Sequence, residues 1–111
     1  MKAPRRGEVW IVDLGLAAKV RPAVVVSVPT RKSDRSLVTL VPHTTSLRGS
    51  RFEVTVPVPF LKAGAFNAQS LVTIPTTKLL RPLGILTPDQ LGQVEVGVRA
   101  WLDLPARPEG R

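Results

Sequence analysis

Residues 21–28 read RPAVVVSV, and residues 37–45 read LVTLVPHTT. Each stretch joins a polar cluster to an apolar, β-branched run, which is the composition of a buried strand. Strands built from these runs would hold Arg21, His43 and the threonine hydroxyls rigidly at one rim of a small sheet. The two stretches therefore predict a β fold with a compact site for a phosphate group.

The segments around these two stretches complete the predicted fold. Short strands are expected at residues 9–14, 52–56 and 69–74, with an edge piece at 79–83, and the strands 9–14 and 23–28 should pair as a hairpin. A helix follows, because Thr87, Pro88 and Gln90 form a capping box with proline at the first helical position. Its apolar stripe consists of Leu91, Val94, Val98, Trp101 and Leu102.

These elements predict a mainly β protein with a C-terminal helix, folded as a small, strongly curved antiparallel barrel. The length of 111 residues favours one domain, expected to cover residues 1–104. Pro105 should end the helix, and residues 105–111 should form a disordered tail because they have nothing to bury.

Charge is the strongest compositional signal. Sixteen Lys and Arg against eight Asp and Glu give a formal net charge of +8, which favours a polyanionic partner and nucleic acid first. A merely solvated basic surface remains the alternative, because the basic residues are scattered along the chain.

The missing residue types exclude several function classes. The chain has no cysteine and one histidine, so we expect no disulfide, no thiol catalysis, no metal site and no other cofactor. No apolar run approaches the ~20 residues of a membrane span, and none follows the basic residues 1–6 as in a signal peptide. We expect a soluble, cytoplasmic protein without membrane contact.

Six short motifs occur in a specific order along the chain. They are RGEVW (6–10), RPAVVV (21–26), VPHTT (41–45), RG (48–49), FEV (52–54) and LGIL (83–86), the last before the helix. Together they resemble the PemK/MazF family of type II toxin–antitoxin ribonucleases, from residue 6 to about residue 104. The resemblance implies an SH3-like barrel of the CcdB/PemK type and a homodimer. It also implies a metal-independent endoribonuclease of the mRNA interferase type, which cuts single-stranded RNA and is inhibited by a cognate antitoxin.

The resemblance implies that Arg21 and Thr44 are catalytic residues. Thr45, next to Thr44, remains a further catalytic candidate. Cleavage through the 2′-hydroxyl would leave a 2′,3′-cyclic phosphate and a 5′-hydroxyl. A guanidinium suits the charge on the phosphorane, and a threonine hydroxyl can donate to the same phosphate. His43 has the one unperturbed pKa suited to acid–base work, about 6.5, but strand alternation predicts that it faces away from Thr44.

RNA contacts are expected from two basic loops that we predict to flank the same edge of the fold. Polar groups near the site add to them. The expected contact residues are Arg31, Lys32, Arg35, Arg48, Arg51, Gln69 and Ser70.

Two other functions remain open from the sequence. The first is a toxin of the same fold that binds a protein target such as DNA gyrase, which would not need Arg21 and Thr44. The second is a basic module that binds RNA without cleaving it, for which the charge and the barrel suffice.

Overall fold

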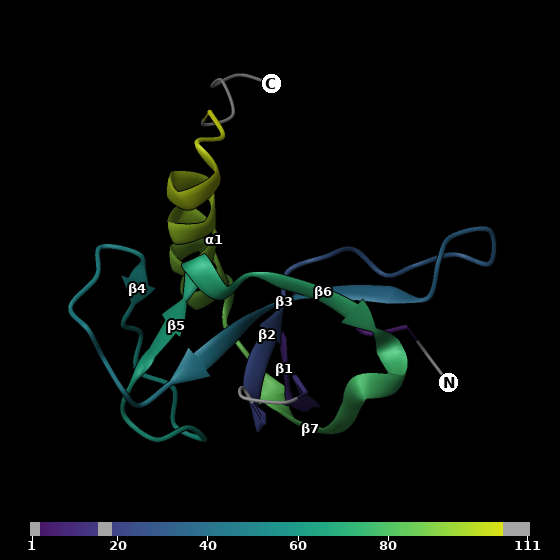
Figure 1. The fold of residues 1–111 in the computed structure, drawn as a ribbon, viewed down its shortest axis with the longest axis horizontal. Helices are drawn as coiled ribbons and strands as arrows, with labels where there is room; N and C mark the ends of the chain where they lie inside the picture. The colour runs from purple at the N-terminus through teal and green to yellow at the C-terminus, as the bar shows by residue number, and fades with distance from the viewer. Residues whose placement is uncertain (1–2, 16–18, 106–111) are drawn as a thin grey trace.

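The structure is a computed structural model that describes residues 3–15 and 19–105. It is mainly antiparallel β structure with one C-terminal α-helix, as the sequence predicts (Figure 1). The elements are β1 (Glu8–Asp13), β2 (Val20–Val25), β3 (Leu37–Thr44), β4 (Glu53–Val54), β5 (Ala65–Asn67), β6 (Val72–Pro75), β7 (Leu79–Ile85) and α1 (Pro88–Leu102), with 3₁₀ turns at Ala68–Ser70 and Thr76–Lys78.

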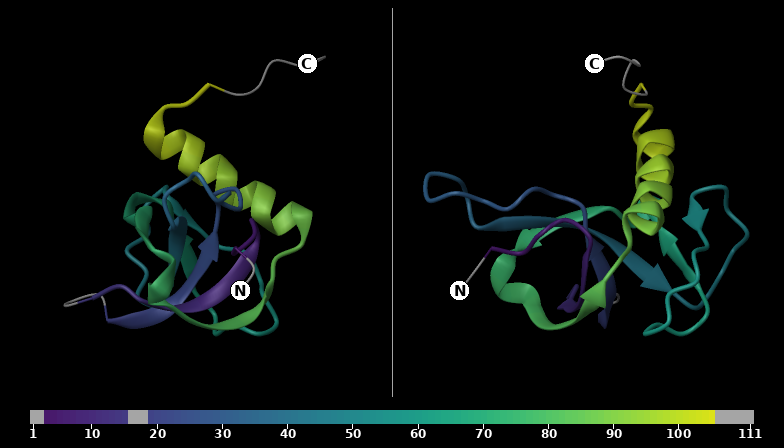
Figure 2. Two further views of the ribbon diagram at one scale, coloured as in Figure 1. Left: turned by 90° about the vertical axis from the view of Figure 1, so that its right-hand side faces the viewer. Right: turned by 180° about the vertical axis from the view of Figure 1, so that it is seen from behind.

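The strands form one sheet in the order β4-β5-β3-β2-β1-β7, and β6 also pairs with β3. The strand pairs of this sheet are antiparallel throughout the described residues, and β1 and β2 form the predicted hairpin. The sheet curls strongly, as two further views show (Figure 2). Within the described residues it does not close, because β4 and β7 lie at its two ends. The expected barrel is therefore an open, curved sheet.

Strand β3 continues through Pro42, although a proline inside a sheet normally costs a ladder hydrogen bond. The amide of Val26 donates to the carbonyl of Thr39 at 2.9 Å, which fixes the hydrogen-bonding phase between β2 and β3. In that phase the nitrogen of Pro42 faces away from β2. On that side β3 changes partner. Its residues up to Leu40 pair with β6, and its residues from His43 onward pair with β5. Pro42 therefore falls where the ladder is already interrupted.

The central strands β1, β2 and β3 are buried on both faces, which explains their continuous apolar runs. One face carries the main core cluster, built on Val9, Val24, Val41 and Phe66. The other face carries a second cluster: Val12, Ala23, Val25, Val38 and Leu40. Because successive side chains of a strand project to opposite faces of the sheet, these residues show which face each neighbouring side chain occupies.

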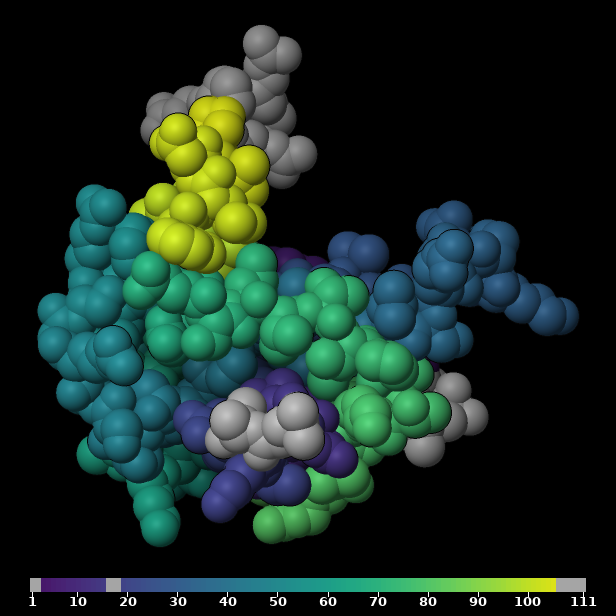
Figure 3. Space-filling view, viewed as in Figure 1, coloured from purple at the N-terminus to yellow at the C-terminus, as the bar shows by residue number. Residues whose placement is uncertain are grey.

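Helix α1 begins at the predicted capping box. The Thr87 hydroxyl accepts from the Gln90 amide at 3.1 Å, and the Gln90 side chain accepts from the Thr87 amide at 2.8 Å. Val94 is fully buried, and a Cβ added to Gly97 would lie 2.6 Å from Val54, so the middle of the helix packs tightly on β4. The last turn extends beyond the sheet (Figure 3).

The predicted apolar stripe is thus only partly buried. Leu91 and Val98 pack against the main core cluster with Val94. Trp101 is 42% exposed and contacts Phe52 edge to face, with 5.3 Å between ring centroids, and Leu102 is 45% exposed. The stripe continues past the end of the sheet because the helix is longer than the surface beneath it.

Several strands differ from the prediction, and the expected strand 52–56 is reduced to the two residues of β4. Strand 69–74 begins instead at Val72, because Asn67 caps a 3₁₀ turn at Ala68–Ser70 by accepting from the Gln69 amide at 3.1 Å. Strand β5 was not predicted from the sequence. The expected tail, residues 105–111, lies outside the described residues apart from Pro105. In the part of the chain that the structure describes, no helix is long and apolar enough to cross a bilayer.

Candidate active site

Arg21 and Thr44 come together through the register of two neighbouring strands. Ala23 pairs with Pro42 and Val24 with Val41, and the same register carried two residues beyond this pairing would set Arg21 opposite Thr44. Residues opposite each other in an antiparallel pair project to the same face, with Cβ atoms about 5 Å apart. Strand alternation gives both residues the same side as Ala23 and Val25, at the rim of the sheet, where Leu61 and Leu83 from the main core cluster also approach them.

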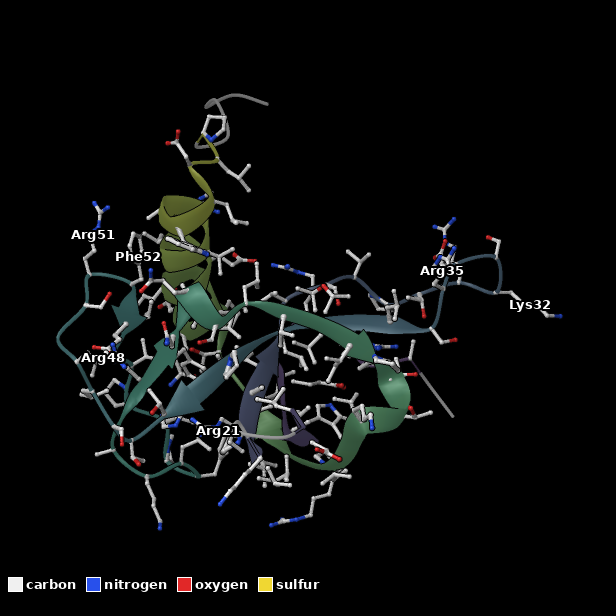
Figure 4. The ribbon with its side chains drawn as sticks, in the orientation of Figure 1. Arg21, Lys32, Arg35, Arg48, Arg51 and Phe52 are labelled. Carbon is white, nitrogen blue, oxygen red and sulfur yellow. The ribbon has the colours of Figure 1, made fainter. Side chains whose placement is uncertain are left out.

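A cleft of about 580 Å³ opens at this rim, and we call it the main cleft. It gathers three of the predicted catalytic residues, Arg21, Thr44 and Thr45, together with His43. Its full lining is Ile11, Arg21, Pro22, His43, Thr44, Thr45, Ser46, Phe60, Leu61, Lys62 and Leu83. Figure 4 shows Arg21 in the lower part of the molecule, near the start of β2.

The Thr44 hydroxyl is held in place but keeps donor capacity. Its oxygen accepts from the Ser46 amide at 3.0 Å, which fixes the turn after β3. Its own donation, to the Ser46 carbonyl, spans 3.5 Å and is too long for a strong hydrogen bond. A phosphate oxygen in the cleft would therefore be a better acceptor for this proton. Thr45 is exposed beside it.

His43 lies under the cleft, with 5% of its surface exposed. It follows Val41 on the face opposite Thr44, and its ring meets Phe66 edge to face with centroids 5.0 Å apart. Burial lowers the pKa of His43 below its usual 6.5, because the imidazolium loses its hydration. The imidazole is therefore neutral near pH 7 and is largely shielded from ligands.

The two basic loops do not flank one edge, and that prediction is wrong. Lys32 and Arg35 project from the β2–β3 loop at one end of the long axis, while Arg48 and Arg51 lie at the other end (Figure 4). The reason is the length of β3, since eight extended residues separate the loops by about 25 Å. Arg31 and Lys32 line a separate depression beside Trp10, away from the main cleft.

Arg48 and Arg51 lie in a loop with a fixed shape. The Glu53 carboxylate accepts from the amides of Arg48, Gly49 and Ser50 at 2.8–3.2 Å. These backbone hydrogen bonds, that from Arg48 first, lower the pKa of Glu53. The Arg51 guanidinium lies over the Phe52 ring, 4.5 Å from its centroid. Neither arginine lines the main cleft.

The remaining predicted contact residues are Ser70, which shares a cleft with Arg21, and its neighbour Gln69. Ser70 lines a smaller cleft of about 290 Å³, shared with Leu14, Arg21, Pro42 and Val72. The Ser70 oxygen accepts from the Asn67 side-chain amide at 3.1 Å, which leaves the hydroxyl proton for another partner. Gln69 is exposed next to it.

Sequence reasoning missed one wall of the main cleft, formed by Phe60, Leu61 and Lys62. The flanking prolines marked this segment only as a stop after a strand. The run of an aromatic residue, an apolar residue and a cation was the available signal. Within residues 3–15 and 19–105, no cluster of three or more His, Asp or Glu residues could hold a metal ion.

Fold and site together define a small, basic β protein with one C-terminal helix and a cleft that contains Arg21 and Lys62. The family model for PemK-like, MazF-like toxins of type II toxin–antitoxin systems matches residues 5–102, and the chain belongs to this family. The resemblance inferred from the sequence motifs is thereby confirmed.

Individual relatives agree with this assignment. Endoribonuclease MazF9 of Mycobacterium tuberculosis is 32% identical over 114 aligned positions, covering 90% of this chain and 97% of that protein. A mycobacterial endoribonuclease solved in complex with its cognate antitoxin superposes with a TM-score of 0.78 at 28% identity, covering 96% of this chain and 100% of that chain. The Mycobacterium tuberculosis toxin MazF-mt6 gives a TM-score of 0.72 at 28% identity, over 89% and 99% of the two chains.

Proposed function

We propose that this protein is an endoribonuclease toxin that cleaves single-stranded RNA in the main cleft without a metal ion. The observation that carries the proposal is the main cleft, because Arg21 and Thr44 both line it. Membership of the toxin family and the endoribonuclease names of its relatives support the activity.

Arg21 and Thr44 have complementary roles in the proposed reaction. The 2′-oxygen attacks the phosphorus and loses its proton, the bond to the 5′-oxygen breaks, and that oxygen gains a proton. The products are a 2′,3′-cyclic phosphate and a 5′-hydroxyl. The Arg21 guanidinium stabilises the charge that builds on the phosphorane, and the Thr44 hydroxyl donates to one of its oxygens. We assign no side chain to proton transfer, because the one imidazole is 5% exposed and faces the core.

The proposal includes a cognate antitoxin, a homodimer and a cytoplasmic location. A relative solved with its cognate antitoxin supports the first partner. Large exposed apolar side chains support a second copy of the chain, because such surface usually marks an interface. These side chains are Ile85, Trp101, Leu102 and Leu104.

The test is incubation of purified protein with mixed-sequence single-stranded RNA in EDTA, with the ends of all fragments mapped. Cuts that leave cyclic phosphate and 5′-hydroxyl ends are expected from the native protein. Arg21→Ala should lower the rate by about 10²–10³-fold while affinity for a 2′-deoxy analogue falls much less. Arg99→Ala removes the same charge from α1, outside the main cleft, and is the matched control.

The same experiment separates the other functions. Intact RNA at high protein concentration would contradict the nuclease, and a gyrase-binding assay would then test a protein-directed toxin. If Arg21→Ala weakened binding and cleavage in parallel, with a reduced salt dependence, Arg21 would be only a phosphate contact of an RNA-binding module.

A further inference from the structure

Phe60 presents an aromatic surface inside the main cleft. The chain has three phenylalanines, and two are core residues, with Phe66 fully buried and Phe52 8% exposed. Phe60 is 39% exposed and lines the cleft that contains Arg21 and Thr44. Phe60 is therefore the one phenylalanine with a large exposed surface, and that surface lies in the same cleft as Arg21.

The ring is held by a glycine on the neighbouring strand β7. A Cβ added to Gly84 would lie 2.7 Å from Cε2, 2.8 Å from Cζ and 3.1 Å from Cδ2 of Phe60. These three atoms are contiguous in the ring, so this side of the ring lies against β7 at Gly84. Gly84 has no positive φ, and the need for glycine here is therefore one of space alone.

The loop that carries Phe60 is fixed at both ends. At its start the Gln90 side chain donates to the Pro57 carbonyl at 2.7 Å. At its end a Cβ on Gly64 would lie 2.2 Å from the Thr44 carbonyl oxygen, so the loop touches the end of β3. Between them the Leu61 amide donates to the Val58 carbonyl at 3.0 Å. The ring is thus preorganised, which lowers the entropic cost of binding a ligand against it.

A nucleobase is the ligand that this wall fits. Aromatic side chains bind single-stranded RNA by stacking on its bases, and cations beside them bind its phosphates. Lys62 lines the same cleft two residues after Phe60, and Arg21 lines it from strand β2. One nucleotide can therefore meet a ring and two cations at once.

We propose that Phe60 stacks on the base next to the scissile phosphate and makes the enzyme prefer a purine there. The preference follows from stacking strength, since a purine offers the larger aromatic face. This inference rests on the proposed ribonuclease function. It assigns Phe60 to substrate selection and leaves the charge stabilisation to Arg21 and Thr44.

The test compares cleavage of RNAs that carry a purine, a pyrimidine or an abasic nucleotide on each side of the mapped cut. Phe60→Leu should lower kcat/KM about tenfold for the preferred purine and leave the abasic substrate nearly unchanged. Phe60→Trp should retain the purine preference. A loss that is equal for all substrates, abasic included, would mean that Phe60 only supports the loop and would overturn the proposal.

Gly84 provides an independent perturbation of the same ring. Gly84→Ala should displace Phe60 and reproduce the selectivity loss of Phe60→Leu. In a Phe60→Ala background the added methyl group meets no ring, so Gly84→Ala should cause no further loss. Gly92→Ala, whose Cβ meets no atom within 4 Å, is the matched control and should cleave normally.

Binding distinguishes failure of this inference from failure of the proposed function. Uncleavable 2′-O-methyl RNA with the same base changes is titrated against the native protein and Phe60→Leu. Cleavage without any Phe60-dependent base preference overturns only the stacking. Binding without cleavage overturns the nuclease proposal. In that case the stacking is still supported if the native protein binds purine-containing RNA more tightly and Phe60→Leu loses this preference. If the native protein neither binds nor cleaves RNA, the stacking proposal is overturned. It is also overturned if Phe60→Leu changes the oligomeric state and this change accounts for its effect.

Discussion

Gly64→Ala should damage the active site without touching a catalytic side chain. The added Cβ would lie 2.2 Å from the Thr44 carbonyl oxygen and 2.8 Å from Cε1 of His43. Real Cβ contacts are essentially never shorter than 3.0 Å, so the loop and the end of β3 must separate by at least 0.8 Å. The clash is with backbone, and no flexible side chain can relieve it.

Two magnitudes follow from this displacement. Overpacking of this kind costs about 1–3 kcal/mol, which lowers the melting temperature by roughly 5–15 °C for a domain of this size. A catalytic group moved by about 1 Å can lose about 10²-fold in rate. We therefore expect a strong loss of kcat at a temperature where the variant is still folded, since Thr44 moves with its carbonyl.

Thermal unfolding followed by circular dichroism and single-turnover RNA cleavage would measure the two effects. Gly92→Ala is the control with the opposite sign, because an open helical glycine replaced by alanine should gain about 0.5–1 kcal/mol. A Gly64→Ala protein with native melting temperature and native kcat would refute the close approach of the loop to Thr44.

Three further predictions concern single side chains. Thr44→Val should lower kcat about 10²-fold and Thr44→Ser should retain most of it, because only the hydroxyl donates to phosphate; equal single-turnover rates for the two variants would contradict this role. Burial keeps the folded pKa of His43 below 6.5, so its contribution to stability is complete above pH 6.5 and is lost as the pH falls toward the folded pKa. Urea unfolding between pH 5 and 8 should show this loss in the native protein and not in His43→Gln, and parallel curves would contradict it. Trp101→Ala should cost about 1–2 kcal/mol through its edge-to-face contact with Phe52, measured by urea unfolding, and the cost should shrink in a Phe52→Leu background.

The sequence predicts the central part of the fold because its signals are local. The β-branched runs mark β1, β2 and β3, and the capping box marks the start of α1 to the residue. Strand β5 escapes prediction because three residues are too few to show alternation, and its pairing partner His43 is more than twenty residues away. Closure of the sheet also depends on pairings between distant segments, which no local pattern encodes.

For the candidate active site, too, local sequence signals are predictable and contacts between distant segments are not. The sequence predicts Arg21 and Thr44 at one site because both adjoin clearly marked apolar runs, Arg21 near the start of β2 and Thr44 at the end of β3. The distance between the basic loops follows from the length of β3, which extends through Pro42 to Thr44. Phe60 acquires its place in the cleft through contact with Gly84, a long-range approach that leaves no periodic signal.

The open sheet has a consequence for how the protein behaves at high concentration. A free strand edge is a template for pairing with another molecule, and natural proteins blunt such edges. Strand β4 has only two residues, β6 has four and ends at Pro75, and β7 contains Pro82 and is paired to β1 with two register shifts. Each unpaired edge is therefore too short or too irregular to recruit a long new strand, and the molecule is protected against edge-to-edge aggregation without closing its sheet.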